Sequence, residues 1–324
     1  MQITVSTPGK IILIGEHTVV YGFPAILTAI SRRLYVTVRS TKKTKSSKDN
    51  PKIINANVKD NHLVRKSIEI FRENFKIEKL PPLEIEISTD IPLNRGLGSS
   101  ASLSSAVIGA LMKGVLNLWN PAKINELSFI AEKSQHTNPS GADNTIVTFG
   151  GLIWYRKEFE FLKSIWSLPI IQYKFPPFIF IDSGEPVETT GEMVISLGVL
   201  YKKQKKKMEE IFYSQETETK KMLWALKQNK IQDLQEAMEN SEKNLEKMEI
   251  VGPSAKKIIG EIRKIGGVAK VSGGGGYKKG SGMLICYHTD PSQIYALTKK
   301  LKLPFFPLLL GEEGIRIENE KKST

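Results

Sequence analysis

"PLNRGLGSSASLSSAVIGALMKGVLNLW" occupies residues 92–119 and combines a glycine-rich turn (Gly96, Gly98) with two serines (Ser99, Ser100) and a long apolar run. A run that is apolar nearly all round predicts a buried helix. Glycine permits close approach of a ligand, and the free N–H groups of a helix start favour an anion. The stretch therefore predicts either a phosphate-binding loop or a serine-capped helix, and it is not a Walker A loop because no Gly-Lys-Ser/Thr follows.

The surrounding chain mixes strands with helices. Residues 83–89 alternate strictly, residues 33–40 are rich in strand formers, and residues 10–16 form a short apolar run that ends at glycine. Residues 61–75 have helical spacing, and Asn120-Pro121 provides an N-cap and a first-turn proline for a further helix. This order predicts an α+β layer.

The balance of elements shifts after a proline pair near residue 176. Helical segments dominate residues 190–263, and strand-like segments return at residues 282–287 and 314–319. We therefore expect two domains, residues 1–174 and residues 175–324.

Composition indicates a folded protein with a basic surface. The 324 residues are 40% hydrophobic and 25% charged, and 47 Lys and Arg against 34 Asp and Glu give a net charge of +13. Much of the excess lies in residues 39–52 and 202–207, which we interpret as solvated faces that also attract polyanionic substrates. A nucleic-acid-binding protein is the less favoured interpretation, because the basic runs lack interleaved aromatic residues.

Residues that bear on cellular location are few. Cys286 is the single cysteine, so no intrachain disulfide forms, and a reducing cytosol is the expected compartment. The first ten residues do not resemble a secretory leader, and no stretch of about 20 apolar residues predicts a membrane span.

Two further stretches suggest a ligand pocket. Residues 270–282, "KVSGGGGYKKGSG", place four successive glycines after a strand-like segment, which is typical either of backbone packed on a ligand or of a flexible surface loop. Residues 7–25, "TPGKIILIGEHTVVYGFPA", crowd Glu16, His17 and Tyr21 beyond an apolar strand. Such crowding of polar groups is typical of a pocket.

Carboxylates mark a third stretch. Asp143 stands in the Pro-Ser-Gly turn of residues 136–144, and Glu132 precedes it near the end of a helix. Such carboxylates bind a divalent cation or accept a proton, although turn capping is the commoner role. His136 and His17, taken singly, are more often structural, and no cysteine and histidine cluster has zinc spacing.

Taken in order, these stretches resemble the motifs of the GHMP small-molecule kinases. Residues 8–22, 92–101 and 270–276 are similar to the three family motifs, and "NPSGADN" at residues 138–144 is similar to the segment that bears the family's aspartate. "GEHTVVYG" is most similar to the form found in mevalonate kinases. The resemblance implies an N-terminal α+β domain and a ferredoxin-like C-terminal domain, with the active site in the cleft between them.

The resemblance implies transfer of a phosphoryl group from ATP, with Mg²⁺, to the primary hydroxyl of mevalonate in isoprenoid precursor synthesis. We expect a cytoplasmic protein that binds neither nucleic acid nor membrane, and the sequence leaves open whether it is a monomer or a homodimer. Asp143 matches the catalytic base and Lys10 the lysine beside it, while Ser100 and Glu132 match the metal ligands. The nucleotide is expected at Arg95, Gly96, Leu97, Gly98, Ser99, Ser100, Ala101, Gly274 and Gly275, and mevalonate at Lys10, Glu16, His17, Tyr21, Asp143 and Thr190, with Thr189 as the alternative to Thr190.

Departures from the family pattern leave some points open. The second motif has Leu-Asn-Arg (93–95) where relatives often have a further glycine, and Arg95 either adds charge at the phosphates or points away. The insertion "YKKGS" (277–281) leaves open which glycines face the nucleotide. Another acceptor, such as phosphomevalonate or a sugar, is the nearest alternative function. A non-catalytic regulator of the same fold is less favoured, because Lys10, Ser100, Glu132 and Asp143 are all present.

Overall fold

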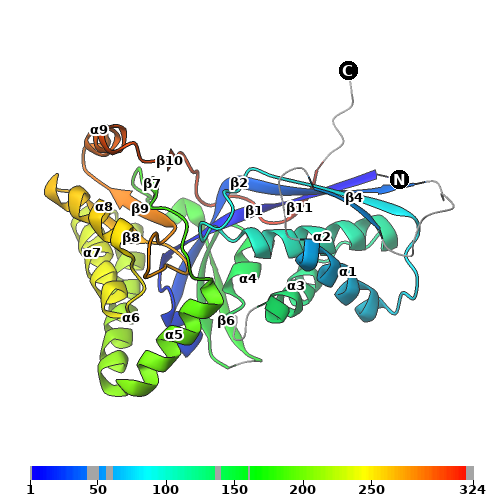
Figure 1. Cartoon of the computed structure of the whole chain (residues 1–324), viewed down its shortest axis with the longest axis horizontal. Coiled ribbons are helices and arrows are strands. Elements are labelled where there is room, and N and C mark those ends of the chain that lie inside the picture. The colour runs from blue at the N-terminus through cyan, green and yellow to red at the C-terminus, as the bar shows by residue number, and fades with distance from the viewer. Residues whose placement is uncertain (1, 42–50, 56–60, 136–139, 160, 319–324) are drawn as a thin grey trace.

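Two β-sheets form the frame of the protein in a computed structural model that describes residues 2–41, 51–55, 61–135, 140–159 and 161–318 (Figure 1). The larger sheet has seven strands, in the order β11-β1-β2-β4-β3, with β5 pairing β2 and β6 pairing β5. Its strands are β1 (Gln2–Ile14), β2 (Ala25–Ser40), β3 (Lys52–Asn55), β4 (Leu83–Thr89), β5 (Leu152–Lys157), β6 (Lys163–Leu168) and β11 (Arg316–Glu318).

A bulge in β1 brings the glycine-rich loop onto the sheet. The register of β1 against β2 shifts between Pro8 and Gly9, which frees the Lys10 amide to donate to the Leu97 carbonyl at 2.9 Å. A side chain at Gly9 would approach the Leu97 carbonyl oxygen to 3.0 Å, so only glycine fits without displacement. The bulge therefore places Lys10 beside the loop that precedes the core helix.

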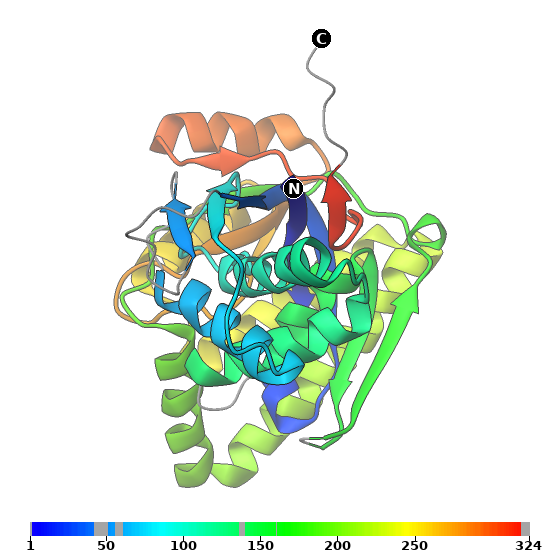
Figure 2. The same cartoon turned by 90° about the vertical axis from the view of Figure 1, so that its right-hand side faces the viewer.

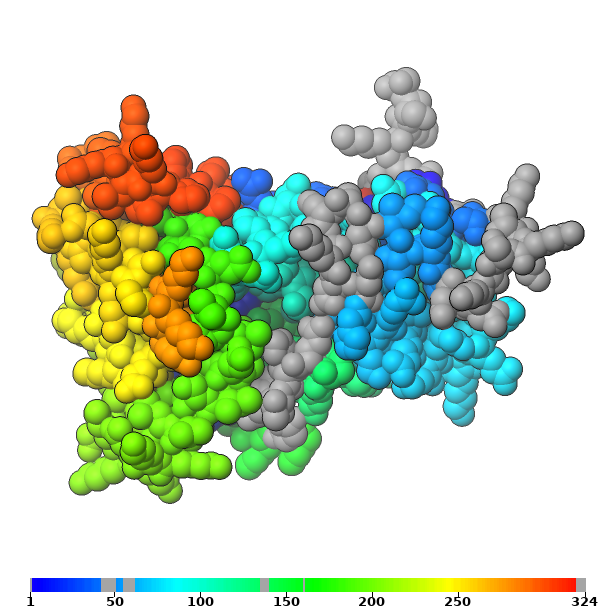
Figure 3. Space-filling view, viewed as in Figure 1, coloured from blue at the N-terminus to red at the C-terminus, as the bar shows by residue number. Residues whose placement is uncertain are grey.

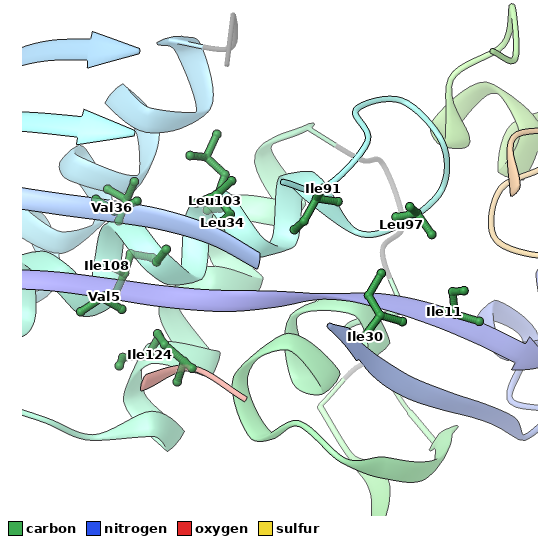
Figure 4. Packing of buried hydrophobic residues seen from close by; sticks show 14 of the residues in the cluster. Val5, Ile11, Ile30, Leu34, Val36, Ile91, Leu97, Leu103, Ile108 and Ile124 are labelled. Atoms are coloured by element: carbon green, nitrogen blue, oxygen red, sulfur yellow. The ribbon is translucent and has the colours of Figure 1, made fainter. Parts of the chain in front are cut away.

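Four helices cover one face of the larger sheet, with α2 innermost (Figure 2). The α2 side chains Leu103 and Ile108 belong to the same buried cluster as Val5 and Val36 of the sheet and Ile124 of α3 (Figure 4). These helices are α1 (Asn61–Phe75), α2 (Ser99–Leu116), α3 (Pro121–Gln135) and α4 (Ala142–Phe149).

Helix α2 is long and apolar enough to pass the length and hydropathy test for a membrane span, which the sequence analysis did not expect. Of its 18-residue window, 72% is buried inside the protein. A mostly buried helix that contacts β1, β2, α1 and α3 has the environment of a core helix in a soluble fold.

The second sheet is formed by the later part of the chain. It is antiparallel in the order β10-β7-β9-β8, and it lies beside β1 in Figure 1. Its strands and the neighbouring helices are β7 (Ile179–Asp182), α5 (Thr190–Lys203), α6 (Lys205–Gln228), α7 (Ile231–Lys247), α8 (Pro253–Lys264), β8 (Val268–Val271), β9 (Met283–Tyr287), α9 (Pro291–Leu301) and β10 (Phe305–Phe306).

Several expected elements are confirmed. The helix expected over residues 61–75 is α1, the alternating strand of residues 83–89 is β4, and the Asn120 side chain accepts from the Lys123 amide at 3.1 Å as an N-cap of α3. The α+β fold class is confirmed by the two sheets with their helices.

Other expectations need correction or extension. The strand expected at residues 10–16 is β1, Gln2–Ile14, so Glu16 lies beyond it in a turn. The last described strand, β11, pairs with β1 and so returns the end of the chain to the larger sheet. The division into residues 1–174 and 175–324 stays a prediction.

The basic runs were expected to be solvated. Lysines in residues 202–207 are exposed where α5 meets α6, in agreement with that expectation. Residues 42–50 of the other run lie outside the described residues.

Candidate active site

The glycine-rich loop and α2 form one wall of a cavity of about 460 Å³. Gly98 is the N-cap of α2 with φ +76°, and no side chain caps the helix start. A Cβ at Gly98 would lie 2.6 Å from Lys10 Cγ, so glycine is required both by the backbone angle and by the packed lysine. Because the first-turn amides lack a side-chain cap, the helix start is available to an anion, and the serine-capped alternative is wrong.

Lys10 and Asp143 form an ion pair on the cavity wall. Lys10 Nζ lies 3.0 Å from Asp143 Oδ1, and both residues line the cavity. The Lys10 side chain is 3% exposed, whereas the Asp143 side chain is 32% exposed. The lysine is therefore fixed within the protein while the carboxylate faces the cavity and can meet a ligand.

Glu132 of α3 contributes a second carboxylate near this pair. Its Oε2 is buried without a hydrogen-bond partner among the described residues, and the residue lines the cavity. Burial and the nearby Asp143 charge raise the pKa of Glu132 well above its usual range. A cation placed here would offset both causes.

The glycine run closes the cavity from the second sheet. Gly273 packs on Gly96, since a Cβ on Gly273 would lie 3.1 Å from the Gly96 Cα. Gly273, Gly274 and Gly275 line the cavity. The Gly276 amide instead donates to the Ile250 carbonyl at 2.9 Å, which answers which glycines face the site.

His17 is held against this run in an unusual backbone conformation. Its φ of 61° and ψ of −44° lie outside the regions that non-glycine residues favour, and its Nε2 lies 3.0 Å from the Gly274 carbonyl oxygen. Burial lowers the pKa of His17 to about 4, so the ring is neutral at pH 7. As a neutral ring that lines the cavity, His17 is a hydrogen-bonding group there rather than a charge.

Most of the expected site residues converge on the cavity, although they come from distant parts of the chain. Thr190, the first residue of α5, also lines it, and its Oγ1 lies 2.7 Å from where a Cβ on Gly274 would stand. The expected residues that line the cavity are Lys10, His17, Gly96, Gly98, Ser99, Ser100, Ala101, Glu132, Asp143, Thr190, Gly274 and Gly275, together with Thr189.

Two residues of the glycine-rich loop do not line the cavity. Arg95 Nε donates to Asp182 Oδ2 at 2.6 Å, and Arg95 Nη1 lies 3.4 Å from Glu185 Oε2, so its charge is engaged at β7 rather than at the helix start. Leu97 is 1% exposed and belongs to the main apolar core. Their expected contact with the nucleotide is not supported by these positions.

Two expected acceptor-binding residues also lie off the wall. Glu16 is fully buried and forms an ion pair with Lys270. The Tyr21 ring packs on Tyr201 and Phe212, with ring centroids 5.1 Å and 4.8 Å apart. Neither residue lines the cavity, and their interactions are an ion pair for Glu16 and ring packing for Tyr21.

Sequence reasoning missed Glu188, a buried cavity residue on the segment between β7 and α5. The available signal was an acidic residue two positions before Thr190 in "GEPVETTGEM". With Glu132, Asp143 and Glu185, it gives the lining four carboxylates against the single lysine Lys10.

Comparisons with known proteins place this architecture. Residues 62–151 match the family model described as GHMP kinases N terminal domain, and residues 2–40 match the galactokinase galactose-binding signature. A mevalonate kinase of Archaeoglobus fulgidus is 29% identical over 278 residues, covering 84% of this chain and 88% of the relative. One from Methanothermobacter thermautotrophicus is 28% identical over 284 residues, covering 85% and 88%.

Solved structures share the fold at lower identity. A Lin0012 protein from Listeria innocua aligns with a TM-score of 0.81 at 21% identity, covering 98% of this chain and all of that chain. The L. major mevalonate kinase in complex with R-mevalonate has a TM-score of 0.75 at 21% identity, covering 95% of both chains. A Streptococcus pneumoniae phosphomevalonate kinase has a TM-score of 0.74 at 19% identity, covering 96% and 99%.

The family model spans α1 to the start of β5, and therefore includes the glycine-rich loop, Glu132 and Asp143. The relatives extend the likeness over most of the chain. Residues 62–151 thus match a GHMP kinase N-terminal domain, and the chain is similar over most of its length to mevalonate kinases.

Proposed function

We propose that the protein transfers the terminal phosphoryl group of ATP to the primary hydroxyl of mevalonate, giving 5-phosphomevalonate and ADP. The observation that carries the proposal is the Lys10–Asp143 pair, 3.0 Å apart on the wall of the cavity that the uncapped start of α2 also lines. The mevalonate kinases similar to this chain support the choice of acceptor.

Asp143 is the proposed base. Its partly exposed carboxylate would accept the proton of the acceptor hydroxyl as that oxygen bonds to the terminal phosphorus and the bond to the ADP oxygen breaks. Lys10 would hold the carboxylate in place and stabilise negative charge near the reacting oxygen. Because the lysine is almost fully buried, its position is set before the substrates bind.

The helix start is the proposed triphosphate site. The first-turn amides of α2 and the backbone at Gly96 and Gly98 would donate to phosphate oxygens, as uncapped helix starts do. Gly273 to Gly275 would face the same phosphates from the second sheet.

Mg²⁺ fits the same wall. The buried Glu132 Oε2 has no hydrogen-bond partner among the described residues, so it is an acceptor to which a cation could bind. Ser100 and Glu132 are the proposed ligands. When bound, Mg²⁺ would neutralise charge that develops on the β- and γ-phosphates.

The acceptor is proposed to lie at the end of the cavity that His17 and Thr190 line. The galactokinase signature over residues 2–40 makes a sugar the second candidate acceptor. A cytoplasmic location and the choice between monomer and homodimer stay predictions.

Acceptor-dependent ADP release tests the function. Purified protein with ATP and Mg²⁺ is offered mevalonate, phosphomevalonate, galactose and homoserine in parallel. Mevalonate is expected to give the highest kcat/KM. Absence of turnover with mevalonate would refute the proposal, and turnover of galactose alone would favour the second candidate.

A further inference from the structure

Glu188 is a cavity residue that the proposed reaction does not yet use. It lies on the segment between β7 and α5, its side chain is 3% exposed, and it lines the cavity. Neither Oε1 nor Oε2 has a hydrogen-bond partner among the described residues. Both acceptor atoms of this buried carboxylate on the cavity wall therefore lack an internal donor.

The buried, unpartnered carboxylate of Glu188 lowers the stability of the folded protein. Burying a charged group without hydrogen bonds is unfavourable, and the nearby Lys278 ammonium offsets this cost only weakly. Lys278 Nζ lies 3.8 Å from Glu188 Oε1, beyond hydrogen-bond distance, and the Lys278 side chain is 58% exposed. Figure 3 shows the orange surface of this insertion against the green surface of the chain before α5.

Glu188 stands two residues before Thr190, which lines the end of the cavity proposed for the acceptor. Its Oε2 lies 3.1 Å from where a Cβ on Gly276 would stand, and Thr190 makes the corresponding approach to Gly274. Gly274 is also the partner of His17. The glycine that packs on the phosphate loop is Gly273, at the opposite end of the run.

We propose that Glu188 binds the acceptor by accepting a hydrogen bond from the hydroxyl group that does not react, which for mevalonate is the 3-hydroxyl. The proposal rests on the proposed function for the identity of the acceptor. A buried acceptor atom without an internal donor rewards a ligand hydroxyl and penalises a ligand that lacks it. Glu188 thereby selects hydroxylated acceptors.

A cycle of enzyme and substrate changes tests this role. Wild type, Glu188→Ala and Glu188→Gln are compared with mevalonate and with 5-hydroxy-3-methylpentanoate, which lacks the 3-hydroxyl. Glu188→Ala is expected to lower kcat/KM for mevalonate by about 10- to 100-fold, the range for a hydrogen bond to a charged group. Glu188→Gln keeps one acceptor oxygen, so its loss is expected to be smaller.

With the deoxy analogue, Glu188→Ala is expected to have a kcat/KM equal to or higher than that of wild type, because the analogue cannot donate to Glu188 and the variant has no unpaired carboxylate. KM for ATP is expected to be unchanged, and the melting temperature of Glu188→Ala is expected to equal or exceed that of wild type. Glu218→Gln is the matched control, since Glu218 is a buried carboxylate of α6 with an unpartnered Oε2 that does not line the cavity. This control is expected to keep the wild-type kinetics.

Three results would overturn the role of Glu188: an equal loss with both acceptors, a rise in KM for ATP, or a fall in melting temperature with wild-type kinetics in the folded protein. If the wild-type protein does not phosphorylate mevalonate but phosphorylates another acceptor, the proposed function is refuted and the proposed role of Glu188 is not. The same cycle with that acceptor and its deoxy analogue then decides on Glu188. Absence of turnover with every acceptor overturns both proposals.

Discussion

Two lysine–carboxylate pairs of this protein have opposite surroundings. Lys10 and Asp143 meet on the cavity wall, where the carboxylate is 32% exposed, whereas Lys270 and Glu16 are both 0% exposed. We call Lys10–Asp143 the open pair and Lys270–Glu16 the closed pair. A carboxylate that faces a cavity, such as Asp143, can leave its lysine partner and accept a proton from a bound substrate. A pair sealed from solvent cannot exchange partners without unfolding its surroundings, so it serves the structure of the site.

The closed pair joins the two sheets behind the cavity. Lys270 lies in β8 and pairs with Glu16 in the turn after β1. Ser272, two residues after Lys270, donates its Oγ hydrogen to the Ile12 carbonyl at 2.9 Å. The carbonyl of Gly274, two residues after Ser272, lies within hydrogen-bond distance of His17 Nε2. Alternate residues from Lys270 to Gly274 thus bind the end of β1 and the turn that carries Glu16 and His17.

The largest expected effect comes from Asp143→Asn, which removes the proposed base from the open pair. We expect kcat to fall by about 10³-fold, within the range of general acid–base catalysis, while ATP affinity is kept. Steady-state kinetics with mevalonate and calorimetric titration of ATP measure the two quantities. A kcat within tenfold of wild type would contradict the assigned role.

Next is Lys270→Met, which leaves Glu16 as a buried carboxylate without its counter-ion. The free energy of unfolding is expected to fall by about 3 kcal/mol, as for other broken buried pairs. Urea denaturation measures it. The double change Glu16→Gln with Lys270→Met is expected to recover part of the loss.

Lys10→Met is the matched comparison for Lys270→Met. It is expected to lower kcat by about 10²-fold or more, with a smaller loss of stability than Lys270→Met, because Asp143 keeps access to solvent. If the two lysine variants lost activity and stability in the same proportions, the distinction between an open and a closed pair would be wrong.

A smaller effect is expected at acidic pH, where protonation of His17 lowers the free energy of unfolding. Its pKa in the folded protein is about 4, below the usual 6.5, so the unfolded chain binds the proton more readily and stability falls as the pH drops from 6.5 toward 4. Between pH 7 and pH 5 the loss is about 2 kcal/mol. The difference in unfolding free energy between wild type and His17→Gln isolates this contribution, and a difference that does not change with pH would contradict it.

The smallest expected effect is that of Glu132→Gln, which removes the second carboxylate, the one near the Lys10–Asp143 pair. The Mg²⁺ concentration needed for half-maximal activity is expected to rise by about tenfold, because one charged ligand is lost. Ser100→Ala is expected to raise it less, since a neutral ligand is removed. Magnesium titrations at saturating ATP measure both, and an unchanged requirement would refute the ligand assignment for Glu132.

Local patterns predicted much of the fold. Helix α1 and strand β4 were predicted with the observed bounds, because their apolar spacing matches the period of the element. The first residues of β1 were missed, since "QITVSTPGK" contains polar residues and a proline. The short strand β11 could not be placed on β1 from sequence, because its partners Thr4 to Ser6 lie more than 300 residues away.

In the candidate site, too, local motifs were predicted from sequence, whereas contacts between distant residues were not. The glycine-rich loop, Glu132 and Asp143 were identified from short motifs, and each lies on the cavity wall. Arg95 and Glu16 were expected at the ligands but lie in ion pairs instead. Glu188 was missed because its sequence signal, an acidic residue two positions before Thr190, is weak, and the burial of its carboxylate without a donor is a property of the folded chain.

The sequence by itself determined the groups available for chemistry: a glycine-rich entry to an apolar helix, a lysine after a Pro-Gly pair, and two carboxylates near one another along the chain. These features depend on residue type and short spacing. Tertiary structure decided which groups are exposed to a ligand, since Asp143 lies open beside Lys10 while Glu16 is sealed with Lys270. The physical reason is that the partner and burial of a charge depend on residues distant in sequence, which only the packing of the two sheets brings together.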